Sequence, residues 1–239
     1  MPAMTMAFNI SNPDVVADLK EGDRVQFLFH VDGKSSRAER FEVIGKEVSN
    51  LVQVIRDGVK PLETGDKVPV FSLVDELGDS FSTEDFQGNY TLITFIFTRC
   101  PVPEFCPLLA TKFLNIQRLL KEKSEEEEGN VRLLSITLDP EFDTPAILQA
   151  YGQRVGVDPA IWNFATGDPD EIQKLAQAFQ VIANGTGATL NHTLTTALIS
   201  PEGEVAKLWP GNRWKAEDVM EIISTSSCLS SCCMDTEGK

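Results

Sequence analysis

The stretch Tyr90-Thr-Leu-Ile-Thr-Phe-Ile-Phe97 runs directly into Thr98-Arg-Cys100-Pro-Val-Pro-Glu-Phe-Cys106-Pro107. Its first part is almost wholly apolar, which is typical of a central strand covered on both faces of a sheet. Its second part is a turn with two cysteines, and it leads into residues 111–121, whose apolar side chains follow the helical period. Because open α/β sheets carry their chemistry at the carboxyl ends of the strands, this turn is the first candidate site.

The same alternation of strand and helix patterns continues along the chain. Two helices are predicted to begin where a capping residue is followed by proline in the first helical position. In chain order, the predicted elements are strands at 70–74 and 90–97, a helix at 111–121, a strand at 131–138, helices starting at Thr144-Pro145 and Asp168-Pro169, a hairpin of 195–200 with 205–208, and a helix at 216–223. A βαβ unit followed by a ββα unit predicts an α/β sandwich of the thioredoxin type.

The chain divides into four predicted parts. Residues 1–48 form a β segment, because Val25–Val31 alternates apolar and polar side chains as a half-buried strand does. Residues 49–66 are predicted to be a linker, and residues 67–226 hold the α/β sandwich. Residues 227–239 are rich in serine and cysteine without apolar periodicity, which predicts a disordered tail.

The composition excludes several classes of function. A net charge of −15 over 239 residues opposes nucleic acid or anionic lipid as the main partner, because phosphate is repelled. No apolar run reaches the roughly 18 residues of a membrane-spanning helix, and the start of the chain has no signal-peptide pattern. Five cysteines, two in the turn and three in the tail, indicate local cysteine chemistry and not a disulfide-stapled scaffold.

The spacing of Cys100 and Cys106 excludes a continuous helix between them if the two thiols are to meet. Six residues apart on an ideal helix, they would point about 240° away from each other. Pro101 and Pro103 force the intervening segment into a loop, which removes this obstacle. Cys106 is then predicted at a helix N-terminus, where the helix dipole favours the thiolate, and Arg99 places a positive charge beside Cys100.

Two such thiols have two uses. They can close reversibly into a Cys100–Cys106 disulfide, or they can bind a soft metal ion such as Cu(I). The alternative is a pair of buried cysteines that are close by chance, but packing alone gives no reason for a proline-rich turn.

His192 is the candidate for a third ligand. It lies in Thr189-Leu-Asn-His-Thr193, just before the strand predicted at 195–200. In a thioredoxin-like topology the segment that enters this strand faces the cysteine turn, and thioredoxin-type oxidoreductases carry a cis-proline there. This chain has no proline between Pro169 and Pro201. A lone histidine is most often a surface or packing residue, but this position favours a Cys, Cys, His site.

Four motifs together resemble the Sco/SenC family over residues 67–223. They are the cysteine turn, Ser135-Ile-Thr-Leu-Asp-Pro-Glu-Phe-Asp-Thr-Pro145, Asn191-His-Thr, and Ile199-Ser-Pro-Glu-Gly203. The resemblance implies a thioredoxin fold that binds copper, as Cu(I) or Cu(II), through Cys100, Cys106 and His192. It also implies a protein that delivers copper to, or sets the thiol state of, the copper site of cytochrome c oxidase, outside the cytoplasm. The family pattern usually has three residues between the cysteines, whereas this chain has five.

Asp139 and Asp143 match the acidic motif of that family. One interpretation is structural, with both carboxylates in a loop near the positive end of the following helix. The other is functional, with both residues supporting the copper site or contacting a partner. The sequence leaves both open.

Met4 and Met6 are the candidates for a second copper site. Two positions apart on a strand, they share one face, and thioether sulfur suits Cu(I). The segment Pro2-Ala-Met-Thr-Met6-Ala-Phe8 with Leu19–Phe27 resembles the CusF-like family, a small β-barrel. The chain begins inside that motif, so a partial barrel is expected here, and we expect the protein to extend further N-terminally through an export signal.

Three functions compete at this stage. The first is a copper metallochaperone for the oxidase copper subunit or another cuproprotein. The second is a thiol-disulfide oxidoreductase or peroxiredoxin-like enzyme that uses Cys100 and Cys106. The third is a redox-sensing interaction module. The tail cysteines, Cys228, Cys232 and Cys233, could bind a soft metal or form stray disulfides, and the sequence assigns them no site.

Overall fold

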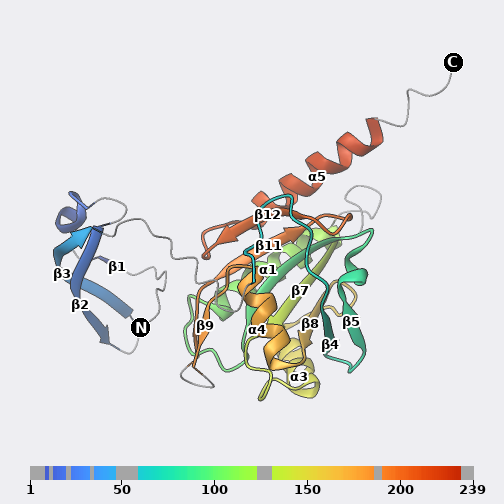
Figure 1. Cartoon of the computed structure of the whole chain (residues 1–239), viewed down its shortest axis with the longest axis horizontal. Coiled ribbons are helices and arrows are strands. Elements are labelled where there is room, and N and C mark those ends of the chain that lie inside the picture. The colour runs from blue at the N-terminus through green and yellow to red at the C-terminus, as the bar shows by residue number, and fades with distance from the viewer. Residues whose placement is uncertain are drawn as a thin grey trace. The chain divides into compact units, whose positions relative to one another are not determined.

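The computed structural model describes residues 9–10, 13–19, 23–32, 35–46, 59–122, 131–185 and 190–232. They belong to two compact units, one within Ala3–Gly58 and the other from Val59 onward, both drawn in Figure 1. Each unit is considered by itself.

The N-terminal unit contains a three-stranded sheet. Its elements are β1 (Asn9–Ile10), a one-turn helix (Pro13–Val16), β2 (Asp23–Asp32) and β3 (Ser35–Lys46). The strand order is β1-β3-β2, with β2 antiparallel and β1 parallel to β3. The strand predicted at Val25–Val31 lies within β2. Among the described residues the unit is an open sheet, which is compatible with the predicted partial barrel.

The large unit is a mixed sheet with helices on both faces. Its strands and helices are β4 (Ser72–Asp75), β5 (Ser80–Ser82), a one-turn helix (Thr83–Phe86), β6 (Tyr90–Ile96), α1 (Cys106–Glu122), β7 (Val131–Thr137), α3 (Pro145–Val155), β8 (Trp162–Thr166), α4 (Pro169–Ala178), β9 (Ala183–Asn184), β10 (Asn191–His192), β11 (Thr195–Ile199), β12 (Val205–Pro210) and α5 (Ala216–Cys232). The sheet order is β12-β11-β6-β7-β8-β4-β5, and β6, β7 and β8 run parallel to one another. The α/β sandwich predicted from the sequence is confirmed.

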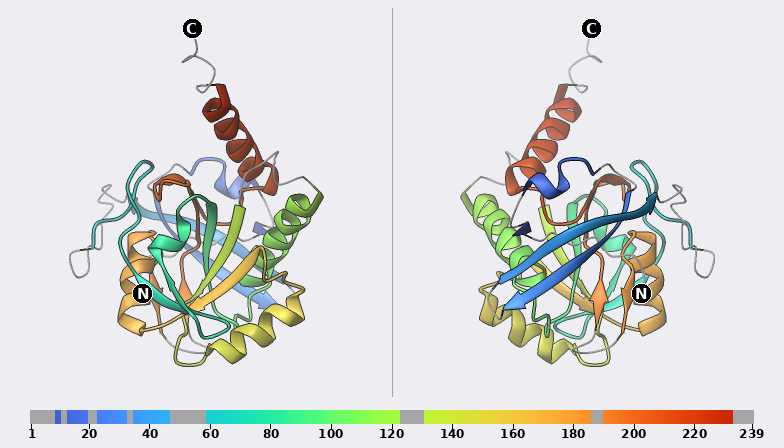
Figure 2. Two further views of the ribbon diagram at one scale, coloured as in Figure 1. Left: turned by 90° about the vertical axis from the view of Figure 1, so that its right-hand side faces the viewer. Right: turned by 90° about the vertical axis from the view of Figure 1, so that its left-hand side faces the viewer.

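The central strand β6 divides two apolar cores, as its nearly unbroken apolar sequence requires. Ile93 and Phe95 pack into the core beneath α4, while Leu92 and Ile96 pack into the core beneath α1, α3 and α5. Figure 2 shows helices on both sides of the sheet. All seven residues of β6 except the first are buried, so the end of this strand is a rigid base for the cysteine turn.

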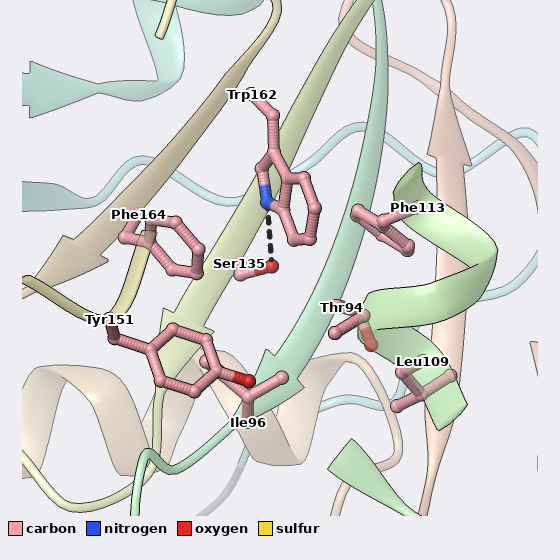
Figure 3. A pocket seen from close by; sticks show the side chains of 9 residues that line it. Thr94, Ile96, Leu109, Phe113, Ser135, Tyr151, Trp162 and Phe164 are labelled. Atoms are coloured by element: carbon pink, nitrogen blue, oxygen red, sulfur yellow. Dashed lines mark hydrogen bonds between the residues drawn. The ribbon is translucent and has the colours of Figure 1, made fainter. Parts of the chain in front are cut away.

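The core beneath α1 is rich in aromatic rings. Phe113 of α1 packs on Trp162, and Trp162 packs on Phe164, with ring centroids 5.2 and 5.4 Å apart. The indole nitrogen of Trp162 donates to the hydroxyl of Ser135 at 3.0 Å, as Figure 3 shows. Because that bond satisfies the indole N–H inside the core, the large ring can be buried without an unpaired donor.

The two predicted helix starts differ in how they are capped. Asp168 accepts hydrogen bonds from the amides of Asp170 and Glu171 at 3.0 and 3.1 Å, which confirms it as the capping residue of α4. Thr144 occupies the capping position of α3 before Pro145, but its side chain makes no capping bond. The proline therefore defines this start, because its N–H is absent and its φ is already helical.

Two predicted boundaries are wrong. The stretch 59–66 belongs to the large unit and not to a linker, because Leu62 is buried and its amide donates to Ala178 at 2.8 Å. Helix α5 continues to Cys232, where a disordered tail was predicted from residue 227. No glycine or proline lies between Ala216 and Cys232, so nothing in the backbone stops the helix.

Within the seven-stranded sheet, two strands were not predicted. β5 and β8 have three and five residues, and such short runs carry no clear period. No helix in the described part of the chain is both long and apolar enough to span a membrane.

Candidate metal centre

The cysteine turn lies at the carboxyl end of β6, as predicted. The amide of Cys100 donates to the carbonyl of Phe97 at 3.2 Å, and α1 begins at Cys106 itself. The side chain of Asn212 donates to the carbonyl of Glu104 at 2.7 Å, which ties the loop to the segment before α5. Cys106 is 1% exposed, whereas Cys100 is only partly buried, so the two thiols differ in access to solvent.

The β9–β10 pair carries His192 to the cysteine turn. His192 pairs with Ala183 across this short ladder and is 3% exposed. Its Nε2 lies 3.9 Å from the Sγ of Cys106, although 86 positions separate the two residues. The rings of Phe97 and Phe105 meet the imidazole edge to face, with centroids 5.6 and 6.3 Å away. These two rings hold the imidazole in place and keep its surroundings dry.

The hydrogen bond of His192 selects its tautomer. Nδ1 lies 2.9 Å from the backbone carbonyl of Thr193, and because a carbonyl only accepts, Nδ1 carries the proton. Nε2 then presents a lone pair toward Cys106. Burial lowers the pKa of His192, so the imidazole is neutral at pH 7 and able to bind a metal.

The charge of the thiol pair lies on Cys100. A hydrogen bond from the thiol of Cys106 lowers the pKa of Cys100 to about 6. Donating that bond, together with burial, raises the pKa of Cys106. The sequence favoured a thiolate at Cys106, whereas burial of Cys106 and its hydrogen bond to Cys100 favour the thiolate at Cys100. The helix N-terminus lowers the pKa of a thiol, but desolvation of Cys106 and the hydrogen bond that its thiol donates to Cys100 raise that pKa by more.

The positive charge of Arg99, which was expected beside Cys100, is paired with a carboxylate. Its guanidinium forms an ion pair with Asp139, with an N–O distance of 2.6 Å, and lies 3.7 Å from the centre of the Phe142 ring. The carboxylate of Asp139 is 6% exposed. Asp139 therefore acts on the turn through Arg99, the residue just before Cys100.

Asp143 holds the turn from inside the protein. Its side chain is fully buried and accepts bonds from the amide of Thr98 at 3.0 Å, from the hydroxyl of Thr98, and from the hydroxyl of Thr137 at 2.6 Å. Thr98 lies two residues before Cys100, and Thr137 ends β7. The carboxylate thus joins the carboxyl ends of two neighbouring parallel strands beneath the turn.

Of the three candidate ligands, Cys106 is the one that lies against both of the others. Cys106 contacts both Cys100 and His192, but within the described residues no three His, Cys, Asp or Glu side chains lie close enough to hold an ion as they stand. Two ligands of one ion, with bonds of about 2.3 Å to sulfur and about 2.0 Å to nitrogen, lie about 3.6–3.8 Å apart. The Cys106–His192 distance of 3.9 Å is close to this value, so these two side chains are spaced as two ligands of one ion would be.

A cavity of about 380 Å³ opens beside the two thiols. Its walls come from α1, α3 and the turn after β6, and they include Cys100, Cys106, Tyr151 and Arg154. Burial raises the pKa of Tyr151 to about 12, so its phenol stays neutral. The guanidinium of Arg154 lies 5.3 Å from the centre of the Tyr151 ring.

Comparison with known proteins places the large unit in a family. The SCO1/SenC family model matches residues 59–227. The chain belongs to the SCO1/SenC family. A second model, copper binding periplasmic protein CusF, matches residues 1–43. Both resemblances noted in the sequence are confirmed.

Three solved structures illustrate the likeness. ScoI of Arabidopsis thaliana, determined with copper bound, is 25% identical, with a TM-score of 0.58 over 70% of this chain and 99% of its own. A SCO1/SenC family lipoprotein from Bacillus anthracis is 26% identical, with a TM-score of 0.61 over 70% of this chain and 98% of its own. BsSco, described as a member of the Sco family of cytochrome c oxidase assembly proteins with a disulfide switch, is 26% identical, with a TM-score of 0.57 over 70% of this chain and 99% of its own. These likenesses confirm the thioredoxin-like sandwich.

Several residues of the SCO1/SenC site escaped the sequence analysis. Thr98 and Thr137 bind Asp143, and Phe97 and Phe105 enclose His192. The two threonines could have been found from the sequence, because each is a polar residue at the carboxyl end of a buried strand, where α/β sheets place their functional side chains. Met4, Met6 and Cys233 lie outside the described residues, and for Cys228 and Cys232 the structure describes only the helical backbone.

The pKa of Cys100 leads to a test by alkylation. We expect iodoacetamide to modify Cys100 with a rate that rises through a midpoint near pH 6, while Cys106 stays unmodified. The thiolate is the reactive form, so the reaction is fast above this pKa and slow below it. Mass spectrometry of peptides across a pH series measures both rates. Protein unfolded in guanidinium is the control, and a native midpoint near the ordinary value of about 8.5 would contradict the assignment.

Proposed function

We propose that Cys100, Cys106 and His192 bind one copper ion, and that the chain carries this ion as cargo for a cuproprotein. The observation that carries the proposal is the unprotonated Nε2 of His192, which faces the Sγ of Cys106 at 3.9 Å. Two thiolates and an imidazole form a donor set that suits copper, with the soft sulfurs favouring Cu(I). Copper binding converts the Cys106 thiol to thiolate and releases its proton.

The longer spacing between the cysteines supports this role. Cys106 is held by α1, whereas Cys100 is followed by the loop 101–105. Movement of that loop would bring Cys100 within reach of an ion already held by Cys106 and His192. A ligand that can move toward and away from the ion also gives a route for handing it to a partner.

Asp139 and Asp143 are proposed as positioning residues for this site. Neither contacts a candidate ligand directly. Asp139 holds Arg99 and Asp143 holds Thr98, the two residues that precede Cys100. Their effect on copper is therefore expected to come through the position of Cys100.

The relatives supply the setting of the proposal. The similar structures include ScoI with copper bound and BsSco, a member of the Sco family of cytochrome c oxidase assembly proteins. We propose the copper subunit of cytochrome c oxidase as the recipient. The likeness to a lipoprotein and to the periplasmic CusF model supports a location outside the cytoplasm. That model also supports Met4 and Met6 as a second copper site in the N-terminal unit.

Anaerobic titration with Cu(I) tests the main site. In protein whose tail cysteines and Met4 and Met6 are replaced, we expect one copper per chain. His192→Ala should weaken that binding by more than about 100-fold, because loss of a direct ligand exceeds the 10–100-fold cost of losing a residue that only orients one. His30→Ala, which removes the other histidine of the chain, is the matched control. Equal affinities for the two variants would rule out His192 as a ligand.

The dithiol also favours a second function. A Cys100 thiolate with a neighbouring thiol donor is the arrangement of a thiol-disulfide oxidoreductase, and BsSco is described as having a disulfide switch. Turnover of a disulfide substrate that survives His192→Ala would support this function independently of copper.

A further inference from the structure

The cavity beside the thiols is large enough to hold a small molecule. Its volume of about 380 Å³ falls within the roughly 300–1,000 Å³ typical of ligand pockets. Much of its wall is apolar, from residues such as Ala110, Leu114 and Val155, and none of its lining residues is acidic. Both Cys100 and Cys106 line it, so a molecule bound there would lie against the redox pair.

Arg154 gives this cavity a charge preference. It is the one cation among the lining residues, and within the described residues it makes no ion pair or hydrogen bond. It lies in the last turn of α3, where a positive charge is favourable, and its guanidinium is exposed and lies over the Tyr151 ring, so its donors remain available to a bound molecule. The chain has a net charge of −15, so this guanidinium makes the cavity beside the two thiols locally more positive than the protein as a whole. Its planar fork matches a carboxylate.

We infer that the cavity binds low-molecular-mass disulfides that carry a carboxylate, with the carboxylate on Arg154 and the S–S bond against Cys100. The inference uses the same two thiols as the copper proposal, but it does not depend on copper binding. It specifies which disulfides the two thiols would reduce: small disulfides that carry a negative charge, in preference to small disulfides that carry a positive charge.

The reaction balances without any further reactant. The thiolate of Cys100, the more exposed of the two sulfurs, attacks the disulfide RS–SR, forms a Cys100–S–SR mixed disulfide and releases one thiolate RS⁻. Cys106 then gives up its proton to a released thiolate and attacks the sulfur of Cys100. The Cys100–Cys106 disulfide forms and the second RS⁻ leaves. The protein loses two electrons, and RS–SR becomes one thiol, RSH, and one thiolate, RS⁻.

Three small disulfides of different charge test the inference on the reduced full chain. The probes are 3,3′-dithiodipropionate, which is a dianion, 2-hydroxyethyl disulfide, which is neutral, and cystamine, which is a dication. Formation of the Cys100–Cys106 disulfide is followed by mass spectrometry under anaerobic conditions. The net charge of the protein alone would favour the dication. We expect the dianion to react faster than cystamine by about tenfold, as one charge-assisted contact allows.

Arg154→Ala is the decisive variant, and Arg118→Ala is its matched control. Arg118 lies on the same helix as Cys106, is paired with Glu122 at 2.7 Å and does not line the cavity. Each variant removes one positive charge, so the two differ only in whether that charge is at the cavity. The preference for the dianion should disappear in Arg154→Ala, persist in Arg118→Ala, and be partly retained in Arg154→Lys. A wild-type preference for cystamine, or an unchanged preference in Arg154→Ala, would overturn the inference. Arg154 is not a proposed copper ligand, so that outcome would leave the copper proposal standing.

Discussion

The Cys106→Ala variant is expected to lose stoichiometric copper binding and the unusual acidity of Cys100 together. Cys106 contacts both other candidate ligands, lying 3.9 Å from His192 and donating its thiol proton to Cys100. Removing the sulfur leaves an ion with two ligands that do not meet. It also removes the main cause of the lowered pKa of Cys100, which should return toward the ordinary value of about 8.5.

Cys106→Ser separates the two effects. A serine hydroxyl still donates a hydrogen bond to the sulfur of Cys100 but is a poor ligand for Cu(I). We therefore expect Cys106→Ser to lose copper binding while Cys100 continues to react with iodoacetamide well below the ordinary pH. Copper titration and alkylation of the same preparations measure the two properties. Tight one-to-one copper binding by either variant would show that the metal lies elsewhere.

The Asp143→Ala variant is expected to lower the free energy of unfolding of the large unit by about 3 kcal/mol or more. The fully buried carboxylate accepts three hydrogen bonds, from the amide and hydroxyl of Thr98 and from the hydroxyl of Thr137. Alanine would leave the buried hydroxyl of Thr137 and the part-buried amide and hydroxyl of Thr98 without this acceptor, at a cost of about 1–3 kcal/mol for each donor that finds no other acceptor.

Denaturant unfolding followed by tryptophan fluorescence measures this loss. All three tryptophans, Trp162, Trp209 and Trp214, belong to the large unit, so the signal reports on that unit. Asp139→Ala is the matched control. Its partner Arg99 is 38% exposed, and breaking such an ion pair should cost only about 1 kcal/mol. A loss for Asp143→Ala no greater than for Asp139→Ala would contradict the structural role of its three bonds.

The sequence was sufficient wherever a feature depends on residues close along the chain. The apolar run at 90–97 predicted the central strand, the prolines predicted a loop that ends at Cys106, and Asp168-Pro169 predicted a capped helix start. Each of these rests on local propensity, on local hydrogen bonding or on the burial of a continuous run. Where local signals were weak, in β8 and at the two ends of the large unit, the predictions failed.

The proximity of His192 to the cysteine turn was predicted from topology and not from any local pattern. The missing proline near His192 indicated a departure from an ordinary thioredoxin-type site, and the structure brings the imidazole to Cys106. The aromatic enclosure of His192 and the Asp143 bridge were not predictable in this way, because their members are distant in sequence and have no shared period.

The sequence alone determined which donor atoms the turn contains: two sulfurs on a proline-rich loop and one imidazole far along the chain. Only the tertiary structure decided how deeply each donor is buried and which hydrogen bonds set its protonation. The helix dipole, a local effect, favoured a thiolate at Cys106, yet burial and the bond to Cys100 place the charge on Cys100 instead. Desolvation and hydrogen bonding depend on neighbours in space, so the state of a cysteine follows from its packing and not from its place in the sequence.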